Sequence, residues 1–495
     1  MSMEEIKWFE HPKIYEINTW PWLQYLSSRY NEKITLANVP KEIFNEELKL
    51  FDAMWLMGVW ERSLKSKEIA TDHPDLQIEY ENALGVYSQD DVIGSPYSVF
   101  YYHVDNNIGG REGLREFRRQ LLKRDVRLIL DYVPNHVAVD HLWTLETSDV
   151  FIRGTEADLK NAPDNFFKVG NSIFAHGRDP YFLPWTDTVQ INAFSSNARE
   201  KAVNTLLNIA EMCDGARCDM AMLVTNEVFK KTWGDRAGTP PTNEFWVEVI
   251  SKVRAKYPEF LFIAEVYWDM EWELQKQGFN FCYDKTLYDR MLYENAESIR
   301  AHLQADWLYQ IKLLRFIENH DEKRAGEVFG DWKSRAGALL TLTLPGAGLL
   351  HEGQLTGYMI KLPVQLGRRT IEHDNPGLLI FYRKLLEVAP AKELKSGKWR
   401  LCEVKSVGND SYKNLIAYQW WTTERRQLIV VNFSANPAQG HVVISDIEFG
   451  SDDWIFNDVL NDKSYTYNGE NLSNFGLFIG LAPWNSHIFE VVKVK

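Results

Sequence analysis

The feature that most constrains the fold is a series of eight short apolar segments separated by helical stretches. Segments such as Gly113–Arg124, Ala198–Met212 and Glu244–Tyr257 have the length and pattern of helices, so the apolar runs between them predict parallel strands with helical crossovers. Eight strands alternating with helices are typical of an α/β chain that closes into a (β/α)8 TIM barrel. The predicted strands are Ile14–Ile17, Met54–Val59, Val126–Leu130, Ala216–Cys218, Leu261–Ala264, Phe279–Tyr283, Leu313–Ile317 and Leu344–Leu350.

Two segments depart from this alternation. Residues 137–190 separate the third and fourth predicted strands, are rich in Asp, Asn, Pro and aromatic residues, and are too long for a single crossover. After about Lys392 the pattern changes to alternating strands, with Leu415–Trp421 and Leu428–Phe433 predicting a hairpin. We therefore expect the barrel over residues 1–136 and 191–391, a small subdomain B over 137–190 at the barrel mouth, and a C-terminal all-β sandwich over 392–495.

Charge and composition limit the kinds of partner. The chain carries 69 acidic and 55 basic residues, a formal net charge of −14, which disfavours nucleic acid and anionic membrane surfaces and leaves a neutral ligand. The longest apolar stretch, Ala336–Leu350, is too short and interrupted to span a bilayer. The N-terminal residues 1–13 carry acids where an export signal needs a basic start, and four cysteines without metal-site spacing predict reduced thiols. These features predict a cytoplasmic protein, whereas nothing in the sequence indicates its oligomeric state.

Four acids stand at or just after the ends of predicted strands. They are Asp131 in LILDYVPNH, Asp219 in GARCDMAM, Glu265 in FLFIAEVYW and Asp321 in RFIENHDEKR. The carboxyl ends of all strands in such a barrel lie on one face, so we expect these four side chains to converge. The four acids are therefore interpreted as one site.

The residues around two of these acids indicate different protonation states. Arg217 stands two residues before Asp219, which places both side chains on the same face of the strand and favours an ionised Asp219. Glu265 is followed by Tyr267 and Trp268 and is expected close to other negative charges, which favours the protonated acid. An ionised and a protonated carboxyl about 5–5.5 Å apart form the arrangement for cleaving a glycosidic bond with retention.

At these residues the chain resembles the α-amylase superfamily, glycoside hydrolase family 13. The segments DYVPNH, GARCDMAM, FIAEVYW and FIENHD resemble the four conserved regions of that family in the family's order, and VQIN, residues 189–192, resembles an additional conserved segment. The resemblance covers the barrel, the inserted subdomain and the C-terminal domain. It implies an enzyme that acts on a neutral α-glucoside or malto-oligosaccharide.

The resemblance also implies residue roles. Asp219 corresponds to the nucleophile, Glu265 to the general acid/base and Asp321 to the acid that stabilises the transition state. Asp131 and Asn135 correspond to residues that order the loop after the third strand. The residues implied to form the substrate pocket are Tyr97, Asp131, His136, Arg217, His320 and Arg324.

Some positions depart from the family pattern. Met222 and Leu223 stand where typical α-amylases carry Lys and His, which disfavours a conventional calcium-dependent endo-amylase. No cofactor is expected; Asn135 occupies a frequent calcium-ligand position, but a hydrogen bond across the loop would serve equally well without metal. The loop aromatics fit either the subdomain core or the pocket wall; they are Phe166, Phe167, Tyr181, Phe182 and Trp185.

Three other functions stay open at the level of sequence. A transglycosylase would use the same residues and pass the glycosyl group to a sugar instead of water; hydrolysis is favoured. A non-catalytic sugar-binding or scaffolding relative is disfavoured because Asp219, Glu265 and Asp321 are all present. A metal-dependent barrel hydrolase is disfavoured because the chain has no clustered ligand motif such as HExxH.

Overall fold

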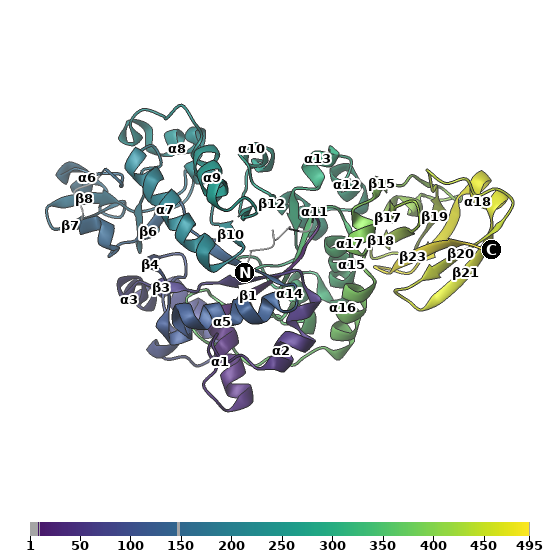
Figure 1. Cartoon of the computed structure of the whole chain (residues 1–495), viewed down its shortest axis with the longest axis horizontal. Helices are drawn as coiled ribbons and strands as arrows, with labels where there is room; N and C mark the ends of the chain where they lie inside the picture. The colour runs from purple at the N-terminus through teal and green to yellow at the C-terminus, as the bar shows by residue number, and fades with distance from the viewer. Residues whose placement is uncertain (1–7, 9, 146–148, 495) are drawn as a thin grey trace. The chain divides into compact units, whose positions relative to one another are not determined.

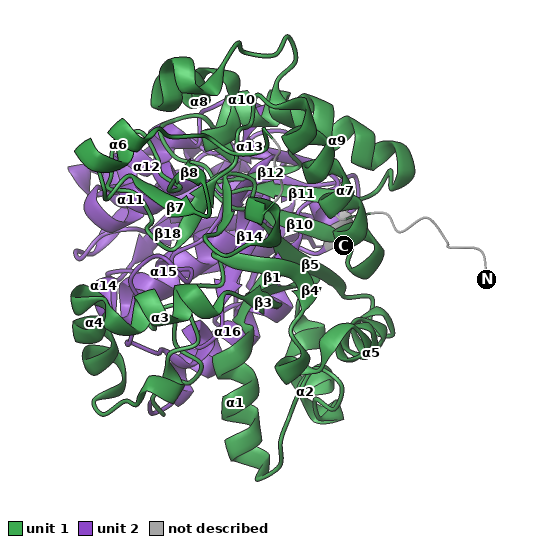
Figure 2. Cartoon of the chain, turned by 90° about the vertical axis from the view of Figure 1, so that its left-hand side faces the viewer, with its two compact units in different colours: residues 1–8, 14–283, 361–371 green, residues 9–13, 284–360, 372–495 purple. Residues whose placement is uncertain are grey.

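The computed structural model describes residues 8, 10–145 and 149–494. Residues 1–7 and 9, which belong to the N-terminal stretch used to argue against an export signal, lie outside the described residues. The chain divides into two compact units, drawn in different colours in Figure 2. The first comprises residues 1–8, 14–283 and 361–371, and the second comprises residues 9–13, 284–360 and 372–495.

Eight strands form a closed barrel in the order β1-β14-β13-β12-β11-β10-β5-β2. Each of the eight apolar segments predicted from the sequence overlaps one of these strands, so the predicted TIM barrel is confirmed. The barrel strands are β1 (Lys13–Asn18), β2 (Ala53–Met57), β5 (Arg127–Tyr132), β10 (Gly215–Cys218), β11 (Leu261–Ala264), β12 (Phe281–Tyr283), β13 (Leu313–Arg315) and β14 (Ala347–His351).

The barrel strands could be predicted from the sequence because they are buried on both faces. Every residue of β2, β5, β10 and β11 is buried, which requires continuous apolar runs rather than alternation. The parallel register of β5 and β10 pairs Asp131 with Arg217, and that of β10 and β11 pairs Arg217 with Ile263. This register brings the ends of three motif-bearing strands side by side.

The helical segments predicted from the sequence fold as helices of the first unit. In α5 the buried residues include Leu114, Phe117 and Leu121, which share one face, and Ser195 caps α7 by accepting from the Ala198 amide. The predicted helices correspond to α5, α7 and α9. The first unit contains α1 (Thr19–Tyr30), α2 (Lys41–Glu46), α3 (Leu64–Asp72), α4 (Pro74–Leu84), α5 (Gly110–Leu122), α6 (Glu156–Asn161), α7 (Ser196–Met212), α8 (Asn226–Trp233), α9 (Phe245–Lys256) and α10 (Glu271–Lys276).

The inserted segment between β5 and β10 has its own small core. Two antiparallel pairs, β6 with β9 and β7 with β8, surround a cluster that includes Val137, Phe151 and Phe174. The short strands are β6 (His136–Ala138), β7 (Phe166–Val169), β8 (Ser172–Ala175) and β9 (Thr188–Gln190), and a further pair is β3 (Trp60–Arg62) with β4 (Val99–Val104). The insertion after the third barrel strand is as expected, while the domain boundaries at 136/137, 190/191 and 391/392 stay predictions.

The second unit also contains helices and two antiparallel sheets. The helices are α11 (Lys285–Tyr293), α12 (Ala296–His302), α13 (Trp307–Gln310), α14 (Ala325–Val328), α15 (Gly330–Thr343), α16 (Pro376–Val388), α17 (Lys392–Lys395) and α18 (Gly469–Phe475). The six-stranded sheet contains, in spatial order, β15 (Lys398–Leu401), β17 (Leu415–Trp421), β18 (Arg426–Asn432), β23 (Ser486–Lys493), β20 (Asp453–Asp458) and β21 (Lys463–Asn468). The three-stranded sheet contains β16 (Val404–Lys405), β19 (Ala438–Val442) and β22 (Leu477–Leu481). These strands carry the green to yellow end of the colour scale in Figure 1.

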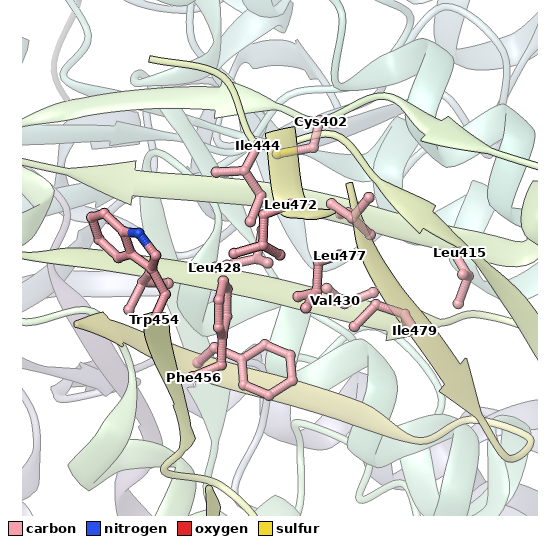
Figure 3. Packing of buried hydrophobic residues seen from close by; sticks show 14 of the residues in the cluster. Cys402, Leu415, Leu428, Val430, Ile444, Trp454, Phe456, Leu472, Leu477 and Ile479 are labelled. Atoms are coloured by element: carbon pink, nitrogen blue, oxygen red, sulfur yellow. The ribbon is translucent and has the colours of Figure 1, made fainter. Parts of the chain in front are cut away.

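The two C-terminal sheets share one apolar core. Figure 3 shows side chains of this cluster, among them Leu428, Val430 and Phe456 from the larger sheet and Leu477 and Ile479 from the smaller one. The predicted hairpin is confirmed as β17 and β18, which pair in antiparallel register. Packing of two antiparallel sheets over a common core agrees with the expected all-β C-terminal domain.

The four cysteines, all among the described residues, are buried and form no disulfide, in agreement with the reduced thiols that the sequence predicted. Burial raises the pKa of the Cys213 and Cys402 thiols to about 12. Over the described residues, no helix is long and apolar enough to cross a membrane.

Candidate active site

Arg217 lies at the centre of the site in the first unit. Its side chain is fully buried, and its Nη1 donates to Asp219 Oδ1 at 2.9 Å while its Nη2 lies 2.8 Å from Glu265 Oε2. Its Nε donates to the Tyr283 hydroxyl at 3.2 Å. Burial alone would lower the pKa of Arg217, but Glu265, Tyr283 and other neighbours outweigh burial and raise that pKa well above its usual range. The guanidinium therefore stays charged and fixes both carboxylates.

Asp219 follows directly after β10, where the predicted alternation of side chains holds. The Arg217 and Asp219 side chains lie on the same side and are hydrogen-bonded, whereas Cys218 between them is buried. Only 7% of Asp219 and 3% of Glu265 is exposed. One guanidinium thus joins two acids that are shielded from water; the sequence predicted its pairing with Asp219 but not its pairing with Glu265.

The surroundings of Glu265 differ from the sequence expectation in one respect. Besides the ion pair with Arg217, its Oε2 accepts from the Met220 backbone N–H at 2.6 Å, and its Oε1 accepts from the Tyr267 hydroxyl at 3.0 Å. We expected neighbouring negative charge to dominate around Glu265, but three donors surround it instead. Met220 adopts a left-handed backbone with φ of 41°, which aims its N–H at Glu265.

Asp131 accepts hydrogen bonds from β2, from the glycine after it and from β3. Its Oδ1 accepts from the Trp55 indole at 3.0 Å, its Oδ2 accepts from the Gly58 amide at 3.1 Å, and its backbone carbonyl accepts from the Trp60 indole. Only 1% of the residue is exposed. These contacts favour a role in ordering the neighbouring loops over the direct substrate contact that was also predicted.

Tyr97 and His136 lie near the same centre. The centroid of the Tyr97 ring lies 5.2 Å from the guanidinium carbon of Arg217. Tyr97 is therefore close to the residue that binds Asp219. The His136 side chain forms a hydrogen bond with the backbone of Tyr97, and its ring lies 5.0 Å from that of Trp185. Burial lowers the pKa of His136 to about 3, so its imidazole is neutral and suited to hydrogen bonding with a neutral sugar.

The loop after β5 is held by Gln190, a residue of the VQIN segment. The Gln190 side-chain amide donates to the backbone carbonyl and to the Oδ1 of Asn135, both at 2.9 Å, and is itself fully buried. The Asn135 amide in turn lies 3.3 Å from His136 Nδ1. Asn135 thus takes part in a hydrogen bond across the loop, which the sequence offered as the alternative to calcium at this position. Among the described residues, no group of three or more His, Cys, Asp and Glu side chains is arranged to hold a metal ion.

In the second unit, His320 and Asp321 lie together after β13. Asn319 Oδ1 accepts from the backbone amides of Asp321 and Glu322 at 2.9 and 2.8 Å, forming a tight turn. This turn places Asp321 Oδ2 3.0 Å from His320 Nε2. The His320 side chain is buried, whereas 41% of the Asp321 side chain is exposed. The turn therefore presents the Asp321 carboxylate with a histidine beside it.

Arg324 pairs with a nearby acid, which the sequence left open as the alternative to a substrate contact. Its Nη1 donates to Glu318 Oε1 at 2.5 Å and to the Glu352 carbonyl at 2.9 Å, and lies 2.7 Å from His351 Nδ1. Burial would raise the pKa of Glu318, but Arg324 and His351 outweigh burial and hold that pKa below its usual value. Since Arg324 is only 5% exposed, these contacts favour a role in positioning the loop over the predicted substrate contact.

Sequence reasoning missed several residues that hold this site. Met220 and Gln190 were quoted only as parts of motifs, and Glu318 stands within FIENHD, where an acid at a strand end was a signal that could have been used. Met222 and Leu223, which replace polar family residues, are buried. The loop aromatics divide: Phe166 is buried and the Phe167 ring contacts that of Phe174, while Tyr181 and Phe182 are exposed.

The chain is similar to known proteins in sequence and in fold. The family model described as alpha amylase, catalytic domain, matches residues 97–376. An alpha-amylase of Haloarcula japonica is 23% identical over 389 residues, covering 73% of this chain and 52% of that protein. Alpha-amylase 3 of Dictyoglomus thermophilum is 23% identical over 284 residues, covering 52% of each chain. The chain thus aligns with about half the length of these curated relatives.

Solved structures show the same fold over nearly the whole chain. A noncanonic maltogenic alpha-amylase of Thermotoga neapolitana is similar with a TM-score of 0.66 and 18% identity, covering 98% of this chain and 99% of that one. A debranching enzyme of Nostoc punctiforme, in a crystal soaked with acarbose, is similar with a TM-score of 0.65 and 17% identity, covering 97% and 98%. At these identities the similarity concerns the fold alone.

Proposed function

Because the chain belongs to the alpha-amylase family, glycoside hydrolase family 13, we propose that it is a retaining glycoside hydrolase for α-glucosidic bonds in oligosaccharides or small α-glucosides. The observation that carries this proposal is the buried Arg217 guanidinium between Asp219 and Glu265. This guanidinium holds two carboxyl groups in one fixed arrangement, and the two groups have different roles in the proposed reaction. The proposed substrate is neutral, in keeping with a neutral His136 and an acidic chain.

The proposed reaction takes two displacements. An Asp219 oxygen attacks the anomeric carbon and the bond from that carbon to the leaving oxygen breaks, while the proton of Glu265 passes to the leaving oxygen. In the second step water loses a proton to Glu265, its oxygen bonds to the anomeric carbon, and Asp219 is released. Asp321 is proposed to bind sugar hydroxyls while the ring carries positive charge. The proposed reaction uses no metal at Asn135, whose side chain is hydrogen-bonded to Gln190.

The test is turnover by two acid-to-amide variants on maltotriose, panose, sucrose and trehalose. We expect Glu265→Gln to lower kcat by about 10²–10⁴-fold, the usual contribution of general acid–base catalysis, and Asp219→Asn to lower it at least as far. The matched control is Asp125→Asn, which removes an exposed carboxylate paired with Arg127 before β5 and should keep native kcat. Near-native turnover by Asp219→Asn on every substrate that the native chain cleaves would refute the mechanism.

The acceptor in the second step is proposed to be water. Chromatography of products formed with added maltose distinguishes the two acceptors, because transfer to sugar yields oligosaccharides longer than the substrate. Predominant formation of such products would identify the chain as a transglycosylase that uses the same covalent intermediate.

A further inference from the structure

Arg62, the last residue of β3, connects the loop that carries Tyr97 to a distant segment of the first unit. Its Nη1 donates to the Gly94 carbonyl at 2.5 Å and to the Val364 carbonyl at 3.1 Å. Gly94 lies three residues before Tyr97, whereas Val364 belongs to residues 361–371, which are coloured with the first unit in Figure 2. One guanidinium nitrogen therefore joins two segments that are far apart in the sequence.

The rest of the Arg62 guanidinium has no polar partner. Its Nε and Nη2 atoms are buried without a hydrogen bond, and Arg62 forms no ion pair with any residue that the structure describes. Its guanidinium carbon lies 5.7 Å from the centroid of the Trp20 ring. Burial lowers the pKa of Arg62 to about 9, so the side chain is still a cation at neutral pH. Burying unpaired donors and an unpaired charge lowers stability, which indicates that Arg62 has a role other than stabilising the fold.

A glycine allows Arg62 to approach the residues around the site. Gly58 has a φ of 75°, and a Cβ atom on it would lie 2.8 Å from Arg62 Nη2 and 3.0 Å from Pro96 Cβ. A glycine is therefore needed here both for the conformation and for the space. The same Gly58 donates its N–H to Asp131 Oδ2, and Pro96 directly precedes Tyr97. Arg62 and the loop of Tyr97 thus pack against the peptide that binds Asp131.

Residues 361–371 are held in place by contacts of their own, so they offer Arg62 a fixed acceptor. Arg368 Nε and Nη2 donate to the two carboxylate oxygens of Asp91 at 2.6 and 3.1 Å. Arg368 also lowers the pKa of Asp91, which keeps this pair charged. The loop before Tyr97 is thus fixed at its start by this ion pair and nearer to Tyr97 by Arg62.

We propose that Arg62 is a positioning residue that holds the Tyr97 ring in its place beside Arg217. It acts through the backbone, because its two carbonyl contacts keep residues 94–96 in one conformation. The proposal rests on the proposed function, in which Tyr97 contacts the sugar that Asp219 attacks. Loss of these contacts should misplace the ring without moving the catalytic acids, and a displacement of about 1 Å can lower turnover by about 10²-fold.

A double-mutant cycle tests this role through kcat/KM for maltotriose. Arg62→Met removes the donors and should lower kcat/KM about tenfold, which is less than the loss in Tyr97→Ala, where the ring itself is removed. In the Tyr97→Ala background, Arg62→Met should change kcat/KM by less than about twofold, because the ring through which Arg62 acts is already absent. Arg62→Lys keeps a cationic donor and provides a second cycle if Arg62→Met does not fold. Its loss should be smaller and should also disappear in the Tyr97→Ala background.

The matched control is Arg124→Met. Arg124, between α5 and β5, also donates to a backbone carbonyl, that of Gln120, and its guanidinium also lies over an aromatic ring, that of Phe44. This variant should keep native kcat/KM, and thermal unfolding of every variant identifies loss of fold. Native kcat/KM in Arg62→Met, or equal losses on substituting Arg62 with and without the Tyr97 ring, would overturn the positioning role. Absence of α-glucoside cleavage by the native chain is a different result, which would refute the proposed function and with it the role of Tyr97.

Discussion

At the scale of single residues, backbone conformation decides how the acids are used. Met220 follows the proposed nucleophile directly, and its left-handed backbone turns an N–H onto Glu265 at 2.6 Å. A non-glycine residue in this conformation stores strain of about 1–3 kcal/mol. The short segment from Asp219 to Met220 thereby fixes both proposed catalytic acids relative to each other.

Met220 is therefore predicted to be a positioning residue. A β-branched side chain is strongly disfavoured at positive φ, so Met220→Val should displace the N–H and lower kcat on maltotriose about tenfold with little change in KM. Met220→Leu, which is unbranched at Cβ, should keep native kcat, and Met220→Gly should retain the conformation at no steric cost. Equal activity of the Val and Leu variants would show that the backbone conformation at this position does not matter for turnover.

Some of these residue positions follow from the sequence and others do not. The shared side of Arg217 and Asp219 was predictable because strand alternation is a local rule. The contact of Gln190 with Asn135 joins residues 55 apart and depends on the pairing of β6 with β9. The donors around Glu265 come from β10, from the turn after β10 and from Tyr267 in the same loop as Glu265, so only the folded chain brings them together.

At the scale of elements, the loop after β13 depends on a buried ionic cluster. Arg324 joins Glu318 at the start of this loop to His351 and Glu352 at the end of β14. A guanidinium suits such multiple contacts because its donors form a rigid, planar group. The cluster thereby fixes the segment that carries His320 and Asp321.

The prediction for this loop concerns stability and activity together. Arg324→Ala leaves Glu318 buried without its cation and should lower the free energy of unfolding by about 3–5 kcal/mol, with reduced kcat because the Asp321 turn loosens. Lys323→Ala removes the adjacent exposed pair with Glu327 and should leave the free energy of unfolding nearly unchanged. Urea unfolding and maltotriose turnover measure both effects, and similar losses in the two variants would contradict a special role for the buried cluster.

The barrel strands were predictable as elements because burial on both faces requires apolar runs. The first and last residues of these strands were less predictable. The sixth strand begins at Phe281 rather than at the predicted Phe279, since Gly278 adopts φ of 112° and the Phe279 amide still bonds to the Leu274 carbonyl of α10. The start of this strand is set by hydrogen bonds that form only in the folded chain. The local apolar pattern of the sequence does not indicate these hydrogen bonds.

At the scale of the whole molecule, buried histidines link folding to pH. His11 in the second unit and His136 and His141 in the first are each buried, and desolvation lowers the pKa of His11 and His136 to about 3 and that of His141 to about 4. Backbone amides donate to Nδ1 of His11 and of His141, which further requires neutral rings in the folded chain.

These shifts predict acid destabilisation that begins below about pH 6.5, the usual histidine pKa in the unfolded chain. Below that pH the unfolded state binds protons that the folded state does not, so stability is fully present above pH 6.5 and falls toward the folded pKa of about 3 to 4. Each histidine should remove about 2 kcal/mol of stability between pH 7 and pH 5. Urea unfolding at both pH values measures the difference, and His141→Gln, which can still accept from the Trp143 amide, should reduce it by that amount. His373→Gln at an exposed position should leave it unchanged, and an unaltered pH dependence in His141→Gln would mean that other groups control acid unfolding.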